Sequence, residues 1–443
     1  MKPWSKTSWQ THPAMQLPDY PNLSDVKKVT DHLEGLPPLV TPLEIHALKT
    51  QLSQAQRGEC FLLQGGDCAE QFSECQESLI TNKFKILLQM SLILLHGLQK
   101  PVIHVGRIAG QYAKPRSNTT ESCFGKTLPS YRGDIINGAE FTEQARMPNP
   151  HRMLEGYHYA ALTMNYLRAL VDGGFADLRH PEYWHLDYAL NPKIKRQFDA
   201  SSKDIQKTLD KLHLLPGAQA YNPKQINFYT SHEALLLPYE QALTRYVEQE
   251  AKWYNLSTHF PWIGKRTSML NGAHIEYMRG IANPLSIKIS TETNPNELIK
   301  VLSKLNPENE PGKINLIHRF GIANIQQHLP PLIKTIQHSG FVVLWSCDPM
   351  HGNTHHTASG IKTRHFDDIL AELRLAFSIH QDSAVPLGGV HFEMTGENVT
   401  ECIGGSTGIT EKQLTNTYKS LVDPRLNYEQ ALEIALMIAE KDY

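Results

Sequence analysis

Eight short apolar runs, separated by longer amphipathic stretches, constrain the fold of this chain more than any other feature of its sequence. They lie at residues 61–64, 101–105, 226–229, 260–263, 286–289, 314–317, 341–345 and 389–392. Runs four to seven begin at residues 260, 286, 314 and 341, so their starts are 26, 28 and 27 residues apart. Each interval can hold a strand, a crossover helix and two loops. The repeated order predicts parallel strands joined by helices.

Helices are predicted between these runs. Thr41-Pro42-Leu43-Glu44 places a capping hydroxyl, an N1 proline and an N3 carboxylate in order, so a helix begins here and continues to about Gln56. Several other intervals have apolar residues at i, i+3 and i+4 spacing. We therefore expect further helices at residues 151–171, 231–254, 296–305, 322–339, 366–381 and 428–440.

Eight strand–helix units predict an α/β fold of the (β/α)8 TIM-barrel type. The alternative, a doubly wound open sheet, usually carries a Gly-rich phosphate fingerprint after its first strand, and Gly65-Gly66-Asp67-Cys68 is not one. We also expect no organic cofactor. Residues 1–58 are predicted to form an N-terminal extension packed on the barrel, and residues 59–443 the catalytic barrel. A helical insertion is expected around residues 175–222.

The composition argues against several classes of protein. Lys and Arg total 43 against 45 for Asp and Glu, so the net charge of -2 does not suit a protein that coats nucleic acid or an anionic membrane. The longest apolar run, 86–98, is shorter than the roughly 20 residues that a transmembrane helix needs. The N-terminus lacks the apolar core of a secretory signal, and the six cysteines include no CxxC pair. We expect a cytoplasmic protein with reduced thiols.

In a (β/α)8 barrel the chemistry lies on loops at the carboxyl ends of the strands, so the residues after each apolar run are the candidates. They are Cys68, Glu70, Arg107, Lys114, Arg116, Glu233, Lys265, Arg266, Lys288, Arg319, Asp348, His351, Glu393 and Asp423. The cations suit phosphate or carboxylate, whereas the thiol, imidazole and carboxylates suit a divalent metal with an open coordination position. The two sets together predict a metal enzyme that acts on phosphorylated substrates.

Each of these residues also has a purely structural interpretation. A lone cysteine such as Cys68 is more often a small buried apolar residue than a ligand. His351 is one of 22 histidines, and Glu393 or Asp423 can be a helix cap or a solvated charge. The arginines can pair with carboxylates on loop surfaces. Only their expected convergence at one end of a barrel favours the metal-and-anion site.

Longer strings in the chain are more specific than this pattern. They are GGDCAE (65–70), GRIAGQYAKPRSN (106–118), YRGDIING (131–138), SHEALLLPYE (231–240), NGAHIEY (271–277), CDPMHGNTH (347–355), KTRHFDDIL (362–370), GGVHFEMTGENVTECIGG (388–405) and DPRLN (423–427). In this order, and over nearly the whole chain, they resemble the class II, plant-like 3-deoxy-D-arabino-heptulosonate 7-phosphate (DAHP) synthases. The resemblance implies a (β/α)8 barrel with extra helices. Its implied reaction condenses phosphoenolpyruvate with erythrose 4-phosphate, releases phosphate and opens the shikimate pathway.

The resemblance also implies roles for individual residues. Metal ligands fall on Cys68, His351, Glu393 and Asp423, and the implied metal is Mn²⁺, Co²⁺ or Zn²⁺. Phosphoenolpyruvate contacts fall on Arg107, Arg266, Lys288 and Arg319, and erythrose 4-phosphate contacts on Lys114, Arg116 and Ser117. Catalytic roles are expected for Lys288, Arg107 and His351. A homo-oligomer and feedback control by aromatic amino acids are implied as well, with Trp4, Trp9 and Tyr20 in effector pockets or subunit contacts.

Three segments depart from the family's pattern. The family's WxGERT reads Trp262-Ile263-Gly264-Lys265-Arg266-Thr267, with a cation in place of an acid. Its LDGAH reads Leu270-Asn271-Gly272-Ala273-His274, and residues 289–293 also differ from the common version. These changes can be drift in a working enzyme. Two alternatives stay open: a homologue that uses another aldose phosphate, such as an amino-sugar analogue, and a catalytically dead relative kept for binding or regulation.

Overall fold

The eight predicted strands are all confirmed and form one parallel sheet. The computed structural model describes residues 3–123, 125–178, 180–186, 191–213 and 226–441. The strands are β1 (Phe61–Gly66), β2 (Val102–Arg107), β5 (Phe228–Thr230), β8 (Trp262–Ile263), β9 (Leu285–Ile289), β10 (Ile314–His318), β11 (Leu344–Cys347) and β14 (Gly389–Glu393). Most of their residues are buried, because helices cover the outside and side chains fill the inside.

The sheet curls into a barrel. Its strands lie in the order β5-β2-β1-β14-β11-β10-β9-β8, and in the middle of that order Leu62 pairs with both Ile103 and Gly389. The two outer strands then meet: Trp262 N donates to His232 O at 3.0 Å, and Ala234 N donates to Trp262 O at 3.0 Å. The first strand pairs with the last one, and the ring of eight strands distinguishes the barrel from an open doubly wound sheet.

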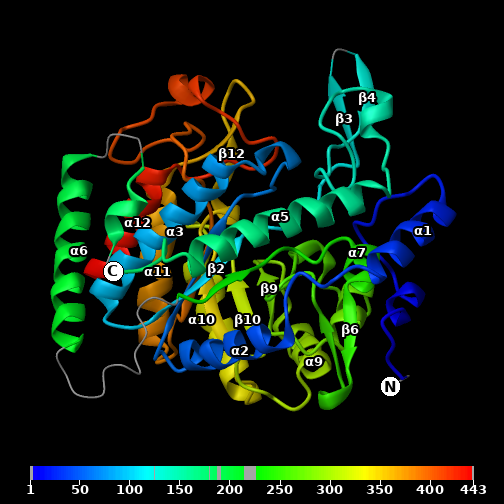
Figure 1. The fold of residues 1–443 in the computed structure, drawn as a ribbon, viewed down its shortest axis with the longest axis horizontal. Coiled ribbons are helices and arrows are strands. Elements are labelled where there is room, and N and C mark those ends of the chain that lie inside the picture. Colours follow the sequence, from blue (N-terminus) through cyan, green and yellow to red (C-terminus); the bar gives the residue numbers. More distant parts are fainter. Residues whose placement is uncertain (1–2, 124, 179, 187–190, 214–225, 442–443) are drawn as a thin grey trace.

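Helices surround this barrel (Figure 1). They are α1 (Leu23–Glu34), α2 (Pro42–Gln56), α3 (Glu77–Leu98), α4 (Glu143–Arg146), α5 (Arg152–Asp172), α6 (Pro192–His213), α7 (Leu237–Ala242), α8 (Ala273–Met278), α9 (Pro295–Leu305), α10 (Ile325–Ser339), α11 (Phe366–Asp382) and α12 (Tyr428–Glu440). Three hairpins decorate the loops: β3–β4 (Thr120–Cys123 and Lys126–Pro129), β6–β7 (Thr244–Val247 and Lys252–Asn255) and β12–β13 (Thr354–His356 and Lys362–Arg364).

One predicted helix is wrong. Residues 231–254 form the short helix α7 followed by the β6–β7 hairpin. Pro238 lies in the first turn of α7, where a missing N–H does no harm, so the helix begins there and not at residue 231. Thr244-Arg245-Tyr246-Val247 then bears the β-branched and aromatic side chains that favour a strand. Ala251 makes the turn with a φ of 52°.

The N-terminal residues contact the barrel in two places. The capping box at Thr41 and Glu44 is present, and α2 packs Leu48 and Leu52 against the start of the strands, below Leu62 and Leu344. Trp4 Nε1 donates to the carbonyl of Glu276 at 3.0 Å, and Trp9 Nε1 donates to Gln241 at 2.9 Å. Both indoles therefore have partners within the chain. The expected insertion around 175–222 contains α6, whereas residues 179, 187–190 and 214–222 of it lie outside the described residues.

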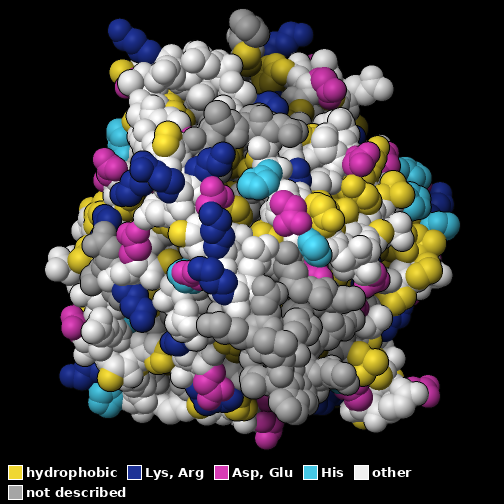
Figure 2. All heavy atoms as spheres, turned by 60° about the vertical axis from the view of Figure 1, so that its left-hand side comes forward, with side chains coloured by type: hydrophobic (Ala, Val, Ile, Leu, Met, Phe, Trp, Pro, Cys, Tyr) yellow, Lys and Arg dark blue, Asp and Glu magenta, His cyan; other side chains and the backbone are white. Residues whose placement is uncertain are grey.

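Helix α3 is the one helix, among those the structure describes, that is long and apolar enough to cross a membrane. In the stretch of α3 that is apolar enough to cross a membrane, however, 67% of the residues are buried inside the protein. Its end lies directly against α12, where a Cβ on Gly97 would come within 2.3 Å of the Ala439 side chain. This close packing marks α3 as a core helix. On the face that carries α6, basic and acidic side chains are interspersed (Figure 2).

Candidate active site

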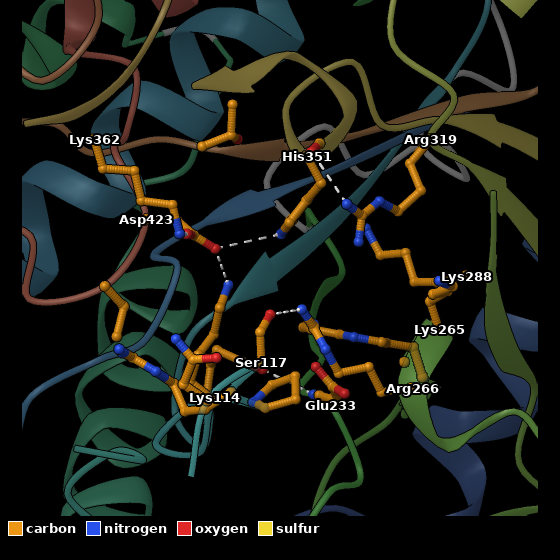
Figure 3. A pocket seen from close by; sticks show the side chains of 18 of the residues that line it. Lys114, Ser117, Glu233, Lys265, Arg266, Lys288, Arg319, His351, Lys362 and Asp423 are labelled. Atoms are coloured by element: carbon orange, nitrogen blue, oxygen red, sulfur yellow. Dashed lines mark hydrogen bonds and ion pairs between the residues drawn. The ribbon is translucent and has the colours of Figure 1, made fainter. Parts of the chain in front are cut away.

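A cavity of about 420 Å³ opens at the carboxyl ends of the strands. Its wall includes all seven residues for which the sequence predicted a substrate contact: Arg107, Lys114, Arg116, Ser117, Arg266, Lys288 and Arg319. Figure 3 shows five of these side chains pointing toward one another: Lys114, Ser117, Arg266, Lys288 and Arg319. Loops after β2, β8 and β10 and the end of β9 supply them, so residues far apart in the sequence share one wall. This concentration of cations suits a ligand with several negative charges.

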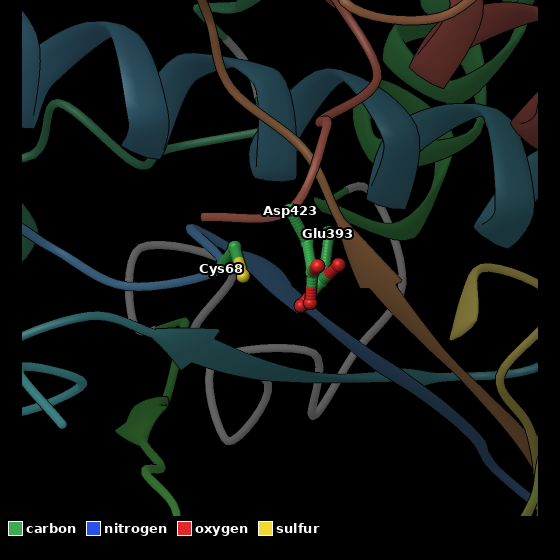
Figure 4. Close-up of side chains that lie close together, drawn as sticks. All are labelled: Cys68, Glu393 and Asp423. Atoms are coloured by element: carbon green, nitrogen blue, oxygen red, sulfur yellow. The ribbon is translucent and has the colours of Figure 1, made fainter. Parts of the chain in front are cut away.

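Three potential metal ligands lie close together (Figure 4), and one of them, Asp423, lines the cavity. The Sγ of Cys68 and carboxylate oxygens of Glu393 and Asp423 all lie within 4.8 Å of one another, and all three residues are buried. Cys68 follows β1, Glu393 ends β14, and Asp423 precedes α12. Because β1 pairs with β14, the barrel's own closure brings these donors together.

His351 completes the cluster. It lies just after β11, and its Nε2 is 3.0 Å from Glu393 Oε1 and 3.9 Å from Asp423 Oδ2. On the other side of the ring, Nδ1 is 2.7 Å from Asp348 Oδ2. A carboxylate at Nδ1 favours the tautomer whose Nε2 lone pair faces the cluster, as in a histidine that binds a metal.

Lys114 is the cation shared by these donors. Its Nζ lies 2.8 Å from Cys68 Sγ, 3.4 Å from Glu393 Oε1 and 2.5 Å from Asp423 Oδ2. Burial would raise the pKa of Glu393, but His351, Lys114 and other cations outweigh it and hold that pKa well below its usual range. Burial and the charge of Glu393 raise the pKa of the Cys68 thiol, against the opposing charge of Lys114.

The donor set fits a divalent transition metal. One thiol, one imidazole and two carboxylates combine a soft, a borderline and two hard donors, a mixture that Zn²⁺, Co²⁺ and Mn²⁺ accept. The two carboxylates lie close together and need a positive charge between them, which Lys114 provides in part. A bound metal would also lower the pKa of the thiol. Cys68, His351, Glu393 and Asp423 are thus able to hold such an ion.

Comparison with known proteins agrees with this geometry. A model of the class-II DAHP synthetase family matches residues 4–439. The chain belongs to this family. It is 44% identical to a phospho-2-dehydro-3-deoxyheptonate aldolase of Neurospora crassa, over 99% of this chain and 94% of the relative. Proteins of the same name from Streptomyces coelicolor and Mycolicibacterium smegmatis are 43% and 40% identical, over 99% and 97% of this chain and 97% and 92% of theirs.

In this member of the DAHP synthetase family, Arg107 is a buried cation of the cavity that several groups hold in place. It donates to the carbonyls of Asp67 and Cys68 at 2.9 and 3.1 Å, and its Nη2 lies 3.1 Å from Glu393 Oε1. The guanidinium also lies over the ring of Trp262, at 5.1 Å from the centroid. Arg107 therefore links the anion-binding wall directly to the metal-ligand cluster.

Lys288 lies deeper and is paired with Asp348. Burial lowers the pKa of Lys288 to about 8, against the opposing charge of Asp348. Arg266 and Ser117 meet at the outer end of the cavity, where Arg266 Nη2 donates to Ser117 Oγ at 2.5 Å. Arg116 is paired with Glu121 of the β3–β4 hairpin at 2.6 Å. The cavity thus has a buried end near Lys288 and a more open end near Arg116.

Three residues of the cavity region were given no individual role by the family resemblance. Glu233 lies in the cavity among the cations, and burial raises its pKa although Lys114 and Lys288 oppose this. Asp348 contacts both Lys288 and His351. Lys362, from the β12–β13 hairpin, is paired with Asp423. Glu233 and Asp348 follow predicted strands, so their positions were signalled, whereas Lys362 lies on a hairpin that no sequence pattern indicated.

A buried ion-pair network supports the metal-ligand loops from behind. Arg425 Nη1 lies 2.7 Å from Asp67 Oδ1, and Arg425 Nη2 lies 2.9 Å from Glu401 Oε1. Asp67 precedes Cys68 in the chain, and Arg425 follows Asp423 by two residues. The Asp67–Arg425 pair therefore fixes the loop of one ligand against the loop of another.

The departures from the family's pattern meet in space. Lys265 is paired with Glu292, which belongs to the unusual 289–293 segment. Lys265 and Lys288 line both the main cavity and a second one of about 230 Å³ that contains Glu292. Asn271 is exposed and is not part of the main cavity wall. The charge reversal at 265 is thus matched by an acid on the next loop.

Proposed function

We propose that the protein is a metal-dependent DAHP synthase of aromatic amino acid biosynthesis. It would condense phosphoenolpyruvate with erythrose 4-phosphate to give DAHP and inorganic phosphate. The observation that carries this proposal is that the seven cations and hydroxyls predicted to bind substrate line a single cavity above a cluster of four potential metal ligands. Membership of the class-II family supports the same reaction.

The residues of the cavity suggest how the two substrates bind. Phosphoenolpyruvate is a trianion near neutral pH, and Arg107, Arg266, Lys288 and Arg319 would hold its phosphate and carboxylate at the inner end. Lys114, Arg116 and Ser117 would hold the aldose phosphate. A divalent metal on Cys68, His351, Glu393 and Asp423 would polarise the aldehyde carbonyl. Arg107 is paired with Glu393, so it would connect bound phosphoenolpyruvate with the metal site.

The chemistry then follows from this alignment. C3 of phosphoenolpyruvate forms a bond to the aldehyde carbon of erythrose 4-phosphate, which leaves positive charge to be quenched at C2. Water adds to C2, and phosphate leaves with cleavage of the C–O bond. Lys288 and Arg107 would stabilise the phosphate as it departs, and His351, oriented by Asp348, would keep the metal in place.

Loss of phosphoenolpyruvate absorbance tests the proposal. The metal-stripped protein should consume phosphoenolpyruvate only when erythrose 4-phosphate and Mn²⁺, Co²⁺ or Zn²⁺ are both added, and DAHP should appear in equal amount. Faster phosphate release with an amino-sugar phosphate than with erythrose 4-phosphate would favour the specialised homologue. No consumption with any metal or aldehyde would favour the catalytically dead relative.

Regulation and assembly are part of the proposal. We infer a cytoplasmic homo-oligomer whose rate responds to tryptophan, phenylalanine or tyrosine, as the family resemblance implies. Because Trp4 and Trp9 are engaged within the chain, effectors would act on other surfaces. Unchanged rates with the three amino acids, singly and together, would remove this part, and light scattering of the purified protein gives the oligomeric state.

A further inference from the structure

Glu372 is a buried acid on α11 that points at two loops of the candidate site. Its side chain has no exposure to solvent. Glu372 Oε1 accepts hydrogen bonds from the backbone N–H groups of Phe320 and Gly321, at 3.1 and 2.9 Å. Glu372 Oε2 accepts one from Asn353 Nδ2 at 2.7 Å. One carboxylate thus binds the loop after β10 and the loop after β11 at once.

These are the loops that carry Arg319 and His351. Arg319 directly precedes Phe320, and Asn353 follows His351 by two residues. The same two loops also touch each other: Ile322 N donates to Asn353 Oδ1 at 2.9 Å, and Arg319 Nη2 donates to the carbonyl of His351 at 3.0 Å, the contact drawn in Figure 3.

Their backbones approach so closely that neither loop can shift alone. A Cβ on Gly352 would lie 2.2 Å from Gly321 N, and a Cβ on Gly321, whose φ is +82°, would lie 2.6 Å from Gly352 O. Only glycine fits at both positions. The junction is therefore specified by its sequence, and Glu372 is the one carboxylate among the described residues that accepts hydrogen bonds from both loops.

We propose that Glu372 is a positioning residue that sets the place of Arg319 relative to His351, and so aligns the anion-binding wall with the metal ligands. This inference rests on the proposed function for the roles of those two residues. A buried carboxylate without substrate contact is costly unless it is fully hydrogen-bonded, and here all its partners belong to the two loops.

Glu372→Gln tests this. The variant keeps the size of the side chain, but its amide nitrogen would face the amide nitrogen of Asn353, so that hydrogen bond is lost. We expect the KM for phosphoenolpyruvate to rise about tenfold and the KM for erythrose 4-phosphate to change less than twofold. Glu276→Gln is the matched control, because Glu276 is also buried but binds Ser8 and Arg279, away from the cavity. It should keep both KM values.

A double-mutant cycle separates positioning from general stability. If Glu372 acts through Arg319, Glu372→Gln should have less than a twofold effect in an Arg319→Ala background. An equal effect in both backgrounds, or an unchanged KM in the single variant, would overturn the proposal. If Glu372→Gln does not fold, Asn353→Ala removes one of the three hydrogen bonds to Glu372 together with the hydrogen bond from Ile322 N, and it should raise the same KM severalfold; no rise would overturn the proposal too.

Binding without turnover distinguishes this inference from the proposed function. The Tm of the Mn²⁺-loaded protein is measured with and without phosphoenolpyruvate, since a ligand of the native state raises it. Absence of turnover in the wild type would remove the proposed reaction alone. A wild-type rise in Tm that is fully retained in Glu372→Gln would remove the positioning role alone.

Discussion

The ammonium group of Lys265 is paired with the carboxylate of Glu292, which lies 27 residues further along the chain on the loop after the next strand. Both residues are partly exposed, so the pair adds little to stability. Its position beside Arg266 and Lys288 makes it relevant to substrate binding instead. Lys265→Glu should place two acids side by side at the cavity mouth and raise the KM for phosphoenolpyruvate severalfold.

The reciprocal change tests whether the two departures compensate each other. Glu292→Lys alone leaves two neighbouring cations, and the double variant Lys265→Glu/Glu292→Lys restores an opposite pair. Steady-state kinetics should return the KM of the double variant to within about twofold of the wild type, with a nonadditive cycle. Simple addition of the two single effects would show that the residues act independently.

Cys68→Ser should remove the metal without unfolding the protein. A hydroxyl is a much poorer ligand than a thiolate for a borderline-soft ion, so metal stoichiometry and kcat should both collapse. The apo-protein should melt at nearly the same temperature, because serine can accept the hydrogen bond that Lys114 gives to Cys68. Metal analysis, turnover and melting curves are measured on the same preparation.

Cys60→Ser is the control for this variant. Cys60 is also buried, but its thiol donates to Gln54 Oε1, outside the cavity. A poorly satisfied hydroxyl there should cost about 1 to 3 kcal/mol of stability while metal content and kcat persist. A metal-replete and active Cys68→Ser protein would refute the assignment of Cys68 as a ligand.

The pH dependence of catalysis should reflect the titration of Lys288. Its pKa is lowered to about 8, so the ammonium loses its proton, and with it one positive charge in the anion site, as the pH rises through 8. We expect kcat/KM for phosphoenolpyruvate to fall above pH 8, approaching tenfold per pH unit. In Lys288→Arg, whose guanidinium stays charged, this fall should disappear even if the overall rate is lower. A fall of the same shape in both proteins would exclude Lys288 as its cause.

A second buried lysine should affect stability. Lys313 lies at the start of β10 and donates to the carbonyls of Ile281 and Asn283, and burial lowers its pKa to about 7. Between pH 7 and the ordinary lysine pKa of about 10.5, the unfolded chain binds more protons than the folded one, so stability rises with pH. Below pH 7 both states are charged and this contribution is constant.

Lys313→Met should lose that dependence. The free energy of unfolding, from urea titrations at pH 7.5, 8.5 and 9.5, should rise in the wild type relative to the variant by at most about 1.4 kcal/mol per pH unit. Lys412→Met, which changes an exposed lysine, should follow the wild type. Parallel curves for all three proteins would show that Lys313 does not titrate in this range.

The strands could be predicted from the sequence because each is a short apolar run. A strand of a parallel sheet that is buried on both faces typically has this pattern. The residues at the carboxyl ends of the strands could be listed as site candidates for the same reason. The prediction of a helix over 231–254 was wrong because Ala234 to Leu236 are apolar and buried like helix residues although they belong to a loop. The role of Glu372 could not be predicted from the sequence, because an acid on an amphipathic helix is usually exposed to solvent. Only the packing of α11 against the loops after β10 and β11 shows that this one is buried.

The pairing of Lys265 with Glu292 was equally out of reach. The change of charge at Lys265 and the unusual 289–293 segment were each visible in the sequence, but whether two loops meet depends on the twist of the barrel and not on local pattern. Lys362 reaches Asp423 for a similar reason, since a hairpin that follows β11 folds back over the cavity. Local sequence patterns thus predict which residues end a strand, whereas the arrangement of the strands in the barrel determines which of these residues become neighbours.

The pairing of β1 with β14 has a consequence for the life of the chain on the ribosome. Cys68 is made more than 300 residues before Glu393 and Asp423, which come just before the helix that packs on α3. A nascent chain that has reached His351 therefore still lacks the two carboxylates of the potential metal site. We expect the active site to form only when the segment that carries Glu393 and Asp423 packs against the rest of the barrel. A chain that still lacks this segment should therefore be inactive.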